Sequence, residues 1–184
     1  MNNGSAAPVV SGYLSPHPGI HWRSIIGFEL AWLALVYFQS LAVTPALAYL
    51  IYGIYRLPNR ARLAVLAIAA VGIVIDSTLV SLDVISFSGT TSEALLLPGW
   101  FILIWLLFAL AAVETMAGFL RPWWLGMLLG ATGGPLSYLG GAALSGGVLQ
   151  FPLASWSFVA LVAVWAVIGV ILGYSRRFYA HTVN

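Results

Sequence analysis

Residues 126–138 read G-M-L-L-G-A-T-G-G-P-L-S-Y and lie inside a long apolar segment. Gly126, Gly130 and Gly134 recur at every fourth position, so in a helix they share one face. In a bilayer, small residues at this spacing let two helix backbones approach closely. Pro135 lacks a backbone donor and is expected to kink the helix. We therefore expect a glycine-rich membrane helix around which the other helices pack.

The composition is that of an integral membrane protein. Of the 184 residues, 61% are hydrophobic and 7% are charged, whereas a soluble domain carries about 25% charged residues. The chain has no cysteine, which excludes disulfides and thiol chemistry. All seven basic residues are arginines, and the net charge of +2 gives no indication of a nucleic-acid partner.

Six apolar segments, separated by prolines and polar turns, predict a compact all-α bundle of six transmembrane helices. The expected domain covers residues 23–177, with a flexible tail at 1–22 and a short tail at 178–184. The second segment rises only about 21 Å, against a hydrocarbon core of about 30 Å, so whether it crosses fully is left open. The expected segments are 24–40, 44–57, 63–85, 98–120, 122–144 and 153–174.

The arginines set the expected orientation, because cytoplasmic loops of membrane proteins are enriched in Arg and Lys. With six spans, all seven arginines fall on one side and both termini are cytoplasmic. With five spans, the split is six against one and the N-terminus lies outside. We expect six, since a non-crossing apolar segment needs protein cover that a small chain can hardly provide.

Three of the five acidic residues, Glu29, Asp76 and Glu114, fall inside the expected spans. An acid at the bilayer centre costs about 2.5–3.5 kcal/mol on insertion scales. It therefore faces the protein interior, finds a partner or becomes neutral. Each of the three is either a functional group or a hydrogen-bonding residue that holds helices together.

Asp76 lies near the expected midplane of the membrane, at a depth that matches the proline of the fifth span. We therefore expect Asp76 to lie against Pro135, with Ser137 and Tyr138 as candidate hydrogen-bond donors. Trp105 lies deeper than the interfacial tryptophans and is expected to line the same site. The same depth applies to two other tryptophans, at positions 32 and 165.

Glu29 and Glu114 have matching depths near the expected cytoplasmic side. If they face each other, they form a paired-carboxylate site that holds one shared proton near neutral pH. Arg23 or Arg121 can reach inward and offset one negative charge. Alternatively, both glutamates extend toward the cytoplasmic interface and have no further role.

Several kinds of site are absent from the sequence. It has no His or Cys cluster for a metal, no phosphate-binding loop of the G-x-x-x-x-G-K type and no nucleophile elbow. His17 and His21 are four apart, but Pro18 between them argues against a helical metal site. We expect no metal and no cofactor. The expected partner is membrane lipid, with a homo-oligomer or a larger membrane complex as further candidates.

Five runs carry a resemblance: F-E-L-A-W-L-A (28–34), G-I-V-I-D-S (72–77), P-G-W-F-I-L-I-W-L-L-F-A (98–109), R-P-W-W (121–124) and G-A-T-G-G-P-L-S-Y-L-G-G-A (130–142). Together they resemble DUF2878, a family of small bacterial inner-membrane proteins of unknown function. The resemblance covers about residues 23–177 and implies a fold and a location without an established activity. The family more often has an amide or neutral residue near Glu29. Its loose association with genes of membrane fatty-acid modification implies a lipid-related role.

Three functional hypotheses follow, each of a different class. The first is an intramembrane site for a lipophilic or acyl-chain ligand, which the protein either binds or transforms. The second is a structural or assembly subunit whose fifth helix docks a partner. The third is a proton-coupled carrier that uses the spanning acids, although the chain shows little sign of the inverted repeats found in many carriers. The candidate ligand-binding residues are Asp76, Ser137, Tyr138, Trp105, Glu29 and Glu114.

Overall fold

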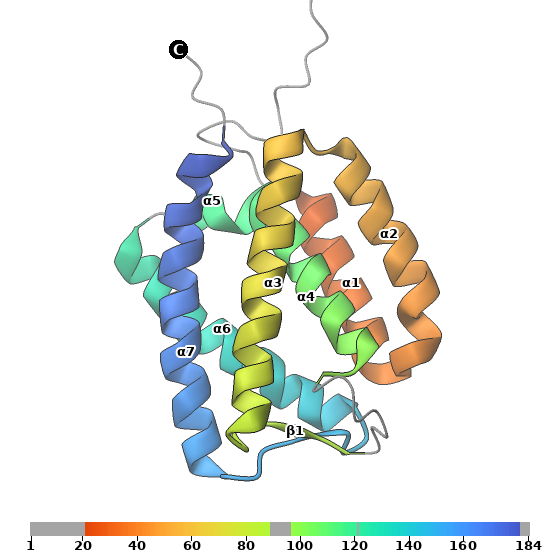
Figure 1. Ribbon diagram of the computed structural model, residues 1–184, viewed down its shortest axis with the longest axis vertical. Coiled ribbons are helices and arrows are strands. Elements are labelled where there is room, and N and C mark those ends of the chain that lie inside the picture. The colour runs from red at the N-terminus through yellow and green to blue at the C-terminus, as the bar shows by residue number, and fades with distance from the viewer. Residues whose placement is uncertain (1–20, 89–96, 121, 181–184) are drawn as a thin grey trace, which may run out of the picture.

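The computed structural model describes residues 21–88, 97–120 and 122–180, and these residues form a bundle of helices (Figure 1). A short antiparallel pairing of β1 (Ser86–Phe87) with β2 (Leu149–Gln150) joins two loops at one end of the bundle. The helices are α1 (Trp22–Phe38), α2 (Val43–Arg56), α3 (Asn59–Ser81), α4 (Gly99–Ala111), α5 (Ala117–Phe119), α6 (Trp123–Leu144) and α7 (Ser155–Ser175), with the single turns η1 (Gln39–Ala42), η2 (Ala112–Met116) and η3 (Arg176–Phe178).

Helices α1 and α2 form a hairpin without a non-helical loop. Gln39, the first residue of the single turn η1, has a φ of 50°, and the chain reverses there, so that α2 runs antiparallel to α1 (Figure 1). Because the connecting turn is itself helical, residues 22–56 form one continuous helical run. The described residues therefore contain five such runs, and the prediction of six separate helices is not matched.

Four of the helical runs are long and apolar enough to cross a membrane. Helix α6 is also long, at 22 residues, but its Gly, Ser, Thr and Trp residues lower its hydropathy below that of the other four. The same small residues let α6 pack closely against α7, so close packing replaces apolar bulk in this helix. The four runs are Trp22–Arg56, Asn59–Ser81, Gly99–Phe119 and Ser155–Phe178.

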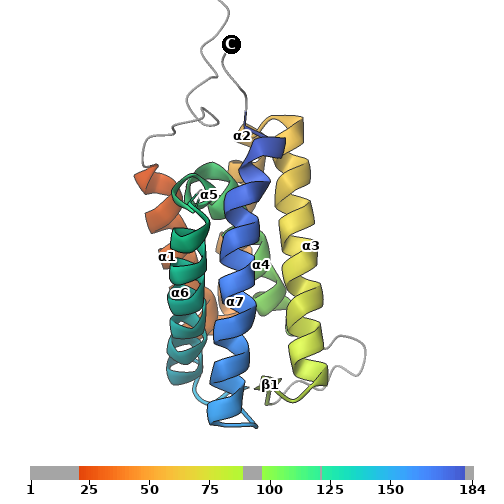
Figure 2. The ribbon, with the colours of Figure 1, turned by 90° about the vertical axis from the view of Figure 1, so that its left-hand side faces the viewer.

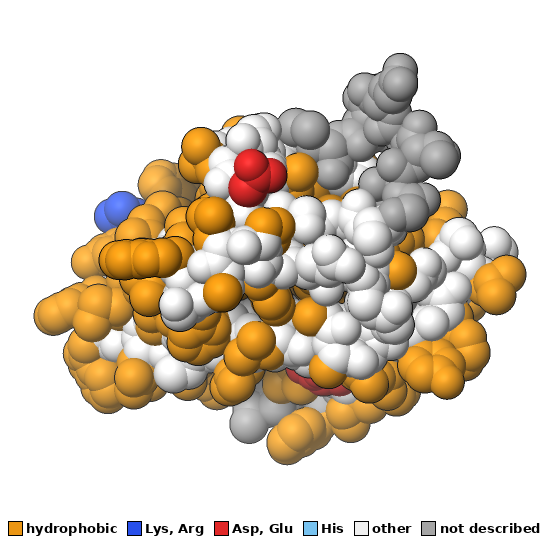
Figure 3. Space-filling model, turned by 90° about the horizontal axis from the view of Figure 1, so that it is seen from below, with side chains coloured by type: hydrophobic (Ala, Val, Ile, Leu, Met, Phe, Trp, Pro, Cys, Tyr) orange, Lys and Arg blue, Asp and Glu red, His pale blue; other side chains and the backbone are white. Residues whose placement is uncertain are grey.

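The outer surface of the bundle suits a lipid environment. Large apolar side chains are exposed on several helices, including Ile51 of α2, Val74 of α3, Leu128 of α6 and Val167 of α7. Seen from the end where β1 lies, hydrophobic side chains gather along the periphery and charged ones are few (Figure 3). A soluble monomer rarely exposes so much contiguous apolar surface. The exposed surface and the four apolar runs together fit a membrane protein.

The face of α6 that carries its four-residue glycine repeat is buried against α7 (Figure 2). A Cβ added to Gly126 would lie 2.7 Å from the carbonyl oxygen of Gly169, and one added to Gly130 would collide with the carbonyl oxygen of Trp165. At Gly134 the added Cβ would collide with the Trp165 ring. The two backbones therefore approach so closely that these positions have no room for a side chain.

Pro135 is buried within α6, and the helix continues past it to Leu144. Its ring removes the N–H that would otherwise bond the carbonyl of Ala131, four residues earlier. The kink predicted at this proline stays a prediction. The predicted domain boundaries do so as well, because most of the tails at 1–22 and 178–184 lies outside the described residues.

The described arginines gather at the end of the bundle opposite β1. The start of α1, the turn between α2 and α3 and the end of α7 all lie at this end (Figures 1 and 2). Arg121 falls outside the described residues. The opposite end carries Asp83 and no arginine within the described ranges. The arginines of the described chain are Arg23, Arg56, Arg60, Arg62, Arg176 and Arg177.

Candidate functional site

Asp76 lies inside the bundle, where two ring side chains donate hydrogen bonds to the same carboxylate oxygen. The Asp76 side chain is 1% exposed. Trp105 Nε1 of α4 donates to Oδ2 over 2.6 Å, and the Tyr138 hydroxyl of α6 donates to Oδ2 over 2.5 Å. Oδ1 is buried and has no hydrogen-bond partner among the described residues. We name Asp76, Trp105 and Tyr138 the aspartate knot, because they tie α3, α4 and α6 together.

Close packing around Trp105 explains why the knot forms. Gly72 lies one turn before Asp76 in α3, and a Cβ added there would collide with the Trp105 ring. The indole therefore lies directly on α3, which brings its Nε1 to Asp76. Trp165 of α7 stacks on Trp105, with 5.6 Å between ring centroids and 8° between planes. The knot is thus held by rigid rings from neighbouring helices.

Ser137 is not a donor to Asp76, so this part of the expected site is wrong. Successive residues of a helix point about 100° apart, and the direction of Tyr138 is the one that meets Asp76. The Ser137 side chain lines a cavity instead. Depth along the helices alone could not separate these two neighbours.

Glu114 is fully buried in the π-helical turn η2 and forms an ion pair with Arg23. The distance from Arg23 Nη2 to Glu114 Oε1 is 2.6 Å. The guanidinium of Arg23 also lies over the Tyr52 ring, 5.6 Å from its centroid, and the Tyr49 hydroxyl donates to the Arg23 carbonyl over 3.2 Å. This ion pair joins η2 to the first turn of α1 and to α2.

Of the two alternatives for the glutamates, the one in which Glu29 and Glu114 face each other is not found, because Glu114 is paired with Arg23. The π-helical turn adds residues to one turn of the helix and so changes the direction in which Glu114 points. Glu114 meets the start of α1, whereas Glu29 lies six residues, or about 9 Å, further along that helix. Arg23 does reach inward, as one alternative had it, and offsets the charge of Glu114. Arg121 lies outside the described residues.

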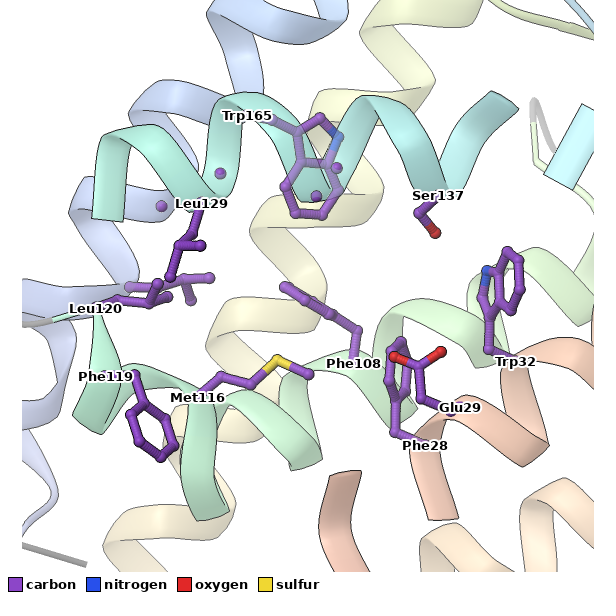
Figure 4. A pocket seen from close by; sticks show the side chains of 15 residues that line it. Phe28, Glu29, Trp32, Phe108, Met116, Phe119, Leu120, Leu129, Ser137 and Trp165 are labelled. Carbon is purple, nitrogen blue, oxygen red and sulfur yellow. The ribbon is translucent and has the colours of Figure 1, made fainter. Parts of the chain in front are cut away.

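A cavity of about 500 Å³ opens between α1, the end of α4 with η2 and α5, α6 and α7 (Figure 4). Ligand pockets typically have volumes of about 300–1,000 Å³. Its apolar end is formed by Met116, Phe119, Leu120 and Leu129 (Figure 4). Its polar end brings together Glu29, Trp32 and Ser137, and the aromatic rings of Phe28, Phe108 and Trp165 lie between the two ends. The other lining residues belong to α6 and α7 and are Gly130, Gly133, Gly134, Gly169 and Leu172.

A smaller cavity of about 50 Å³ lies beside the aspartate knot and shares lining residues with the large cavity. Trp105 and Tyr138 line it, and so does Ser137, which also lines the large cavity. Asp76 lines neither cavity. A molecule in the large cavity would therefore meet Glu29 and Ser137, while the rings of the knot separate it from Asp76.

Several lining residues carry a signal in the sequence, and others carry none. Trp32 and Trp165 lie too deep in their spans to be interfacial anchors. Gly133 lies one position away from the four-residue glycine repeat, on a different face of α6, and a Cβ added to it would meet no atom within 4 Å. Met116 and Phe119 are ordinary apolar residues in an apolar span. Among the described residues, no three His, Asp or Glu side chains come together as a metal site would require.

Comparison with known proteins supports a family assignment. A family model described as a protein of unknown function, DUF2878, matches residues 21–171. Searches of curated proteins and of solved structures found no match. The match covers well over half of the chain and extends from the start of α1 into the last turns of α7. The chain is therefore a member of the DUF2878 family.

Proposed function

We propose that this protein binds one lipophilic, single-chain ligand within the membrane, in the cavity between α1, α6 and α7. The observation that carries the proposal is the division of the cavity lining. Glu29, Trp32 and Ser137 lie at one end, while the opposite end is apolar (Figure 4). An amphiphile with one chain and one small polar head is divided in the same way. Its chain would contact the apolar end of the cavity, and its head would contact the polar end.

The apolar end is suited to a chain whose shape varies. Met116 is unbranched and fills irregular space, and it lies beside Phe119 and Leu129. A ligand that enters from water gains about 0.8 kcal/mol for each buried methylene. A ligand that enters from lipid gains little from the same contact, because its chain was already in hydrocarbon. The polar end of the cavity therefore decides which membrane molecule binds.

The aspartate knot has a supporting role in this proposal. Trp105 receives its position from Asp76 and Gly72, and its other face stacks on Trp165. Trp165 in turn lines the large cavity. The knot thus holds one wall of the cavity in place, while Asp76 itself lies outside the lining and does not contact the ligand.

The other two hypotheses have less support. The glycine face of α6, which was the expected docking face of an assembly subunit, is covered by α7 of the same chain. A carrier that passes protons among three acids would need them near one another. Asp76 lies in the knot, Glu114 is paired with Arg23, and Glu29 lies in the cavity wall.

We further propose that the protein resides in a bacterial inner membrane with its arginine end in the cytoplasm. The gathering of the described arginines at one end supports this orientation, because positive charge is retained on the cytoplasmic side. Both ends of the described helical region lie at that same end (Figures 1 and 2). A reporter that is active only in the cytoplasm should give a signal when fused after Asn184 and none when fused after Ser88. A reporter that is active only outside the cytoplasm should give the opposite result. The reverse pattern would overturn the orientation.

The binding proposal is tested by closing the cavity. Gly133 lines it and has room for a side chain, so Gly133→Leu should fill the space without strain. Gly99→Leu is the matched control, because its added Cβ also meets no atom within 4 Å and Gly99 does not line the cavity. The probes are dodecyltrimethylammonium and 1-dodecanol, and native mass spectrometry of protein released from lipid nanodiscs counts bound molecules.

We expect wild-type protein and Gly99→Leu to bind one molecule of at least one probe. Gly133→Leu should weaken that binding about tenfold, which corresponds to a loss of about 1.4 kcal/mol of binding free energy. Equal binding by all three proteins would show that the probe lies elsewhere. The absence of one-to-one binding to wild-type protein would overturn the proposed function.

A further inference from the structure

We infer that the polar end of the cavity recognises a positively charged head, so that the ligand is a lipophilic ammonium compound. The inference rests on the proposed function and names the class of its ligand. Its basis is the juxtaposition of the Glu29 carboxylate with aromatic rings at one end of an otherwise apolar cavity (Figure 4). A hydroxyl or a carboxylate head would match this arrangement less well.

The first argument is charge. Glu29 is exposed to the cavity, and no described residue forms an ion pair or a hydrogen bond with its carboxylate. The nearest arginine along α1, Arg23, is already engaged by Glu114. Acids within membrane spans are costly and are normally paired. Because no residue within the described ranges places a positive charge beside Glu29, a positively charged ligand would complete the pair.

The second argument is the aromatic lining. Phe28, Trp32, Phe108 and Trp165 all line the cavity, and Glu29 and Trp32 come from adjacent turns of α1. Cations are attracted to the faces of aromatic rings, and proteins recognise quaternary ammonium groups by this interaction. The Trp32 ring is held from the side of α6, since a Cβ added to Gly140 would lie 3.3 Å from its edge.

The third argument is selectivity among membrane molecules. A fatty acid would bring a second carboxylate next to Glu29, and two like charges side by side repel each other. A fatty alcohol could donate one hydrogen bond to Glu29, but its neutral head gains nothing from the electrostatic attraction of the rings. An ammonium head benefits from both the carboxylate and the rings, so the polar end favours it over either competitor.

The test compares two probes that share a chain and differ in head charge. Dodecyltrimethylammonium and 1-dodecanol are titrated against protein in nanodiscs of phosphatidylcholine at pH 7, and native mass spectrometry gives the bound fraction. The variants are Glu29→Gln, which keeps the size of the side chain and removes its charge, and Trp32→Leu, which removes the ring. Asp83→Asn is the control, because Asp83 is an exposed carboxylate at the β1 end that does not line the cavity.

We expect wild-type protein and Asp83→Asn to prefer the ammonium probe. Glu29→Gln should weaken ammonium binding about tenfold, the effect of losing one interaction with a charged partner, and change alcohol binding less than about threefold. Trp32→Leu should weaken ammonium binding about threefold or more. Ratios between variants remove the different partitioning of the two probes into the nanodisc lipid.

Two results would overturn the inference while leaving the proposed function intact. One is alcohol binding to wild-type protein as tight as ammonium binding. The other is an unchanged preference for ammonium in Glu29→Gln that is folded by its melting temperature. If neither probe binds to wild-type protein, the proposed function and this inference fail together. If Trp32→Leu alone has no effect, the carboxylate carries the recognition and the aromatic argument is wrong.

Discussion

The aspartate knot and the large cavity place an acid in apolar surroundings in two different ways. Asp76 is 1% exposed and accepts hydrogen bonds from Trp105 and Tyr138. Glu29 faces a cavity of about 500 Å³ and receives no hydrogen bond from any described residue. The rings of the knot separate the two sites. Asp76 is therefore part of what holds the helices together, whereas Glu29 is left with capacity for a partner that is not part of the described chain.

Helix α6 contributes to both arrangements through two rows of residues. In the row with Gly126 and Gly130, an added Cβ would meet the backbone of α7, although Gly130 also borders the cavity. A second row with Gly133 and Ser137, also four residues apart, lines the cavity. Gly133 and its neighbour Gly134, which belongs to the first row, point about 100° apart around the helix. One residue of offset thus decides whether a side chain added to α6 would collide with α7 or would enter open space.

The largest expected effect tests this difference between the two rows. Gly130→Leu should destabilise the fold by more than about 3 kcal/mol, because overpacking of a core typically costs 1–3 kcal/mol and here the clash is with backbone. Gly133→Leu is the control from the other row and should leave the melting temperature nearly unchanged. Both variants are measured in the same detergent by thermal unfolding with separation by size. Equal melting of the two variants would show that α6 does not have a sealed and an open side.

A smaller effect is expected when the acid of the knot is replaced. Asp76→Leu leaves the Trp105 and Tyr138 donors without their acceptor, at about 1–3 kcal/mol for each buried group. Asp76→Asn keeps an acceptor oxygen at the same place, so its free energy of unfolding should fall clearly less than that of Asp76→Leu. Thermal unfolding of both variants, beside wild-type protein, measures the difference. If asparagine and leucine destabilise equally, the negative charge of Asp76 matters to the fold more than its hydrogen bonds do.

Much of the aspartate knot can be predicted from the sequence, but little of the cavity can. The depth of a residue follows from the rise of a helix, so Asp76 and Tyr138 could be matched across two spans. The direction of a side chain around its helix does not follow from depth, which is why Ser137 was expected beside Asp76. The π-helical turn at Ala112–Met116 changes the direction of Glu114. No composition or spacing rule reveals such a turn, so the sequence leaves open which arginine pairs with Glu114.

The chain reversal at Gln39 is a second feature that the sequence does not reveal. Apolar segments and arginine positions locate most of the helices, because burial in lipid requires long apolar runs. The reversal after α1 instead depends on one residue with a positive φ and a single helical turn. A glycine or a proline would have marked such a turn, but this reversal contains neither. The sequence therefore predicts two separate helices where the structure has one continuous helical run that folds back.

The smallest expected effect makes the sharpest comparison between the two acids. Glu29→Leu is the same kind of change as Asp76→Leu, since each replaces a carboxylate in an apolar span by leucine. At Glu29 no described donor is left without a partner, and the surrounding wall is mostly apolar. The free energy of unfolding should therefore change by no more than about 0.5 kcal/mol, as for a substitution away from any network. Thermal unfolding without added ligand measures it, and Glu29→Gln serves as the control of equal size. A loss as large as that of Asp76→Leu would mean that Glu29 also holds helices together, and then the cavity would have no unpaired acid to offer a ligand.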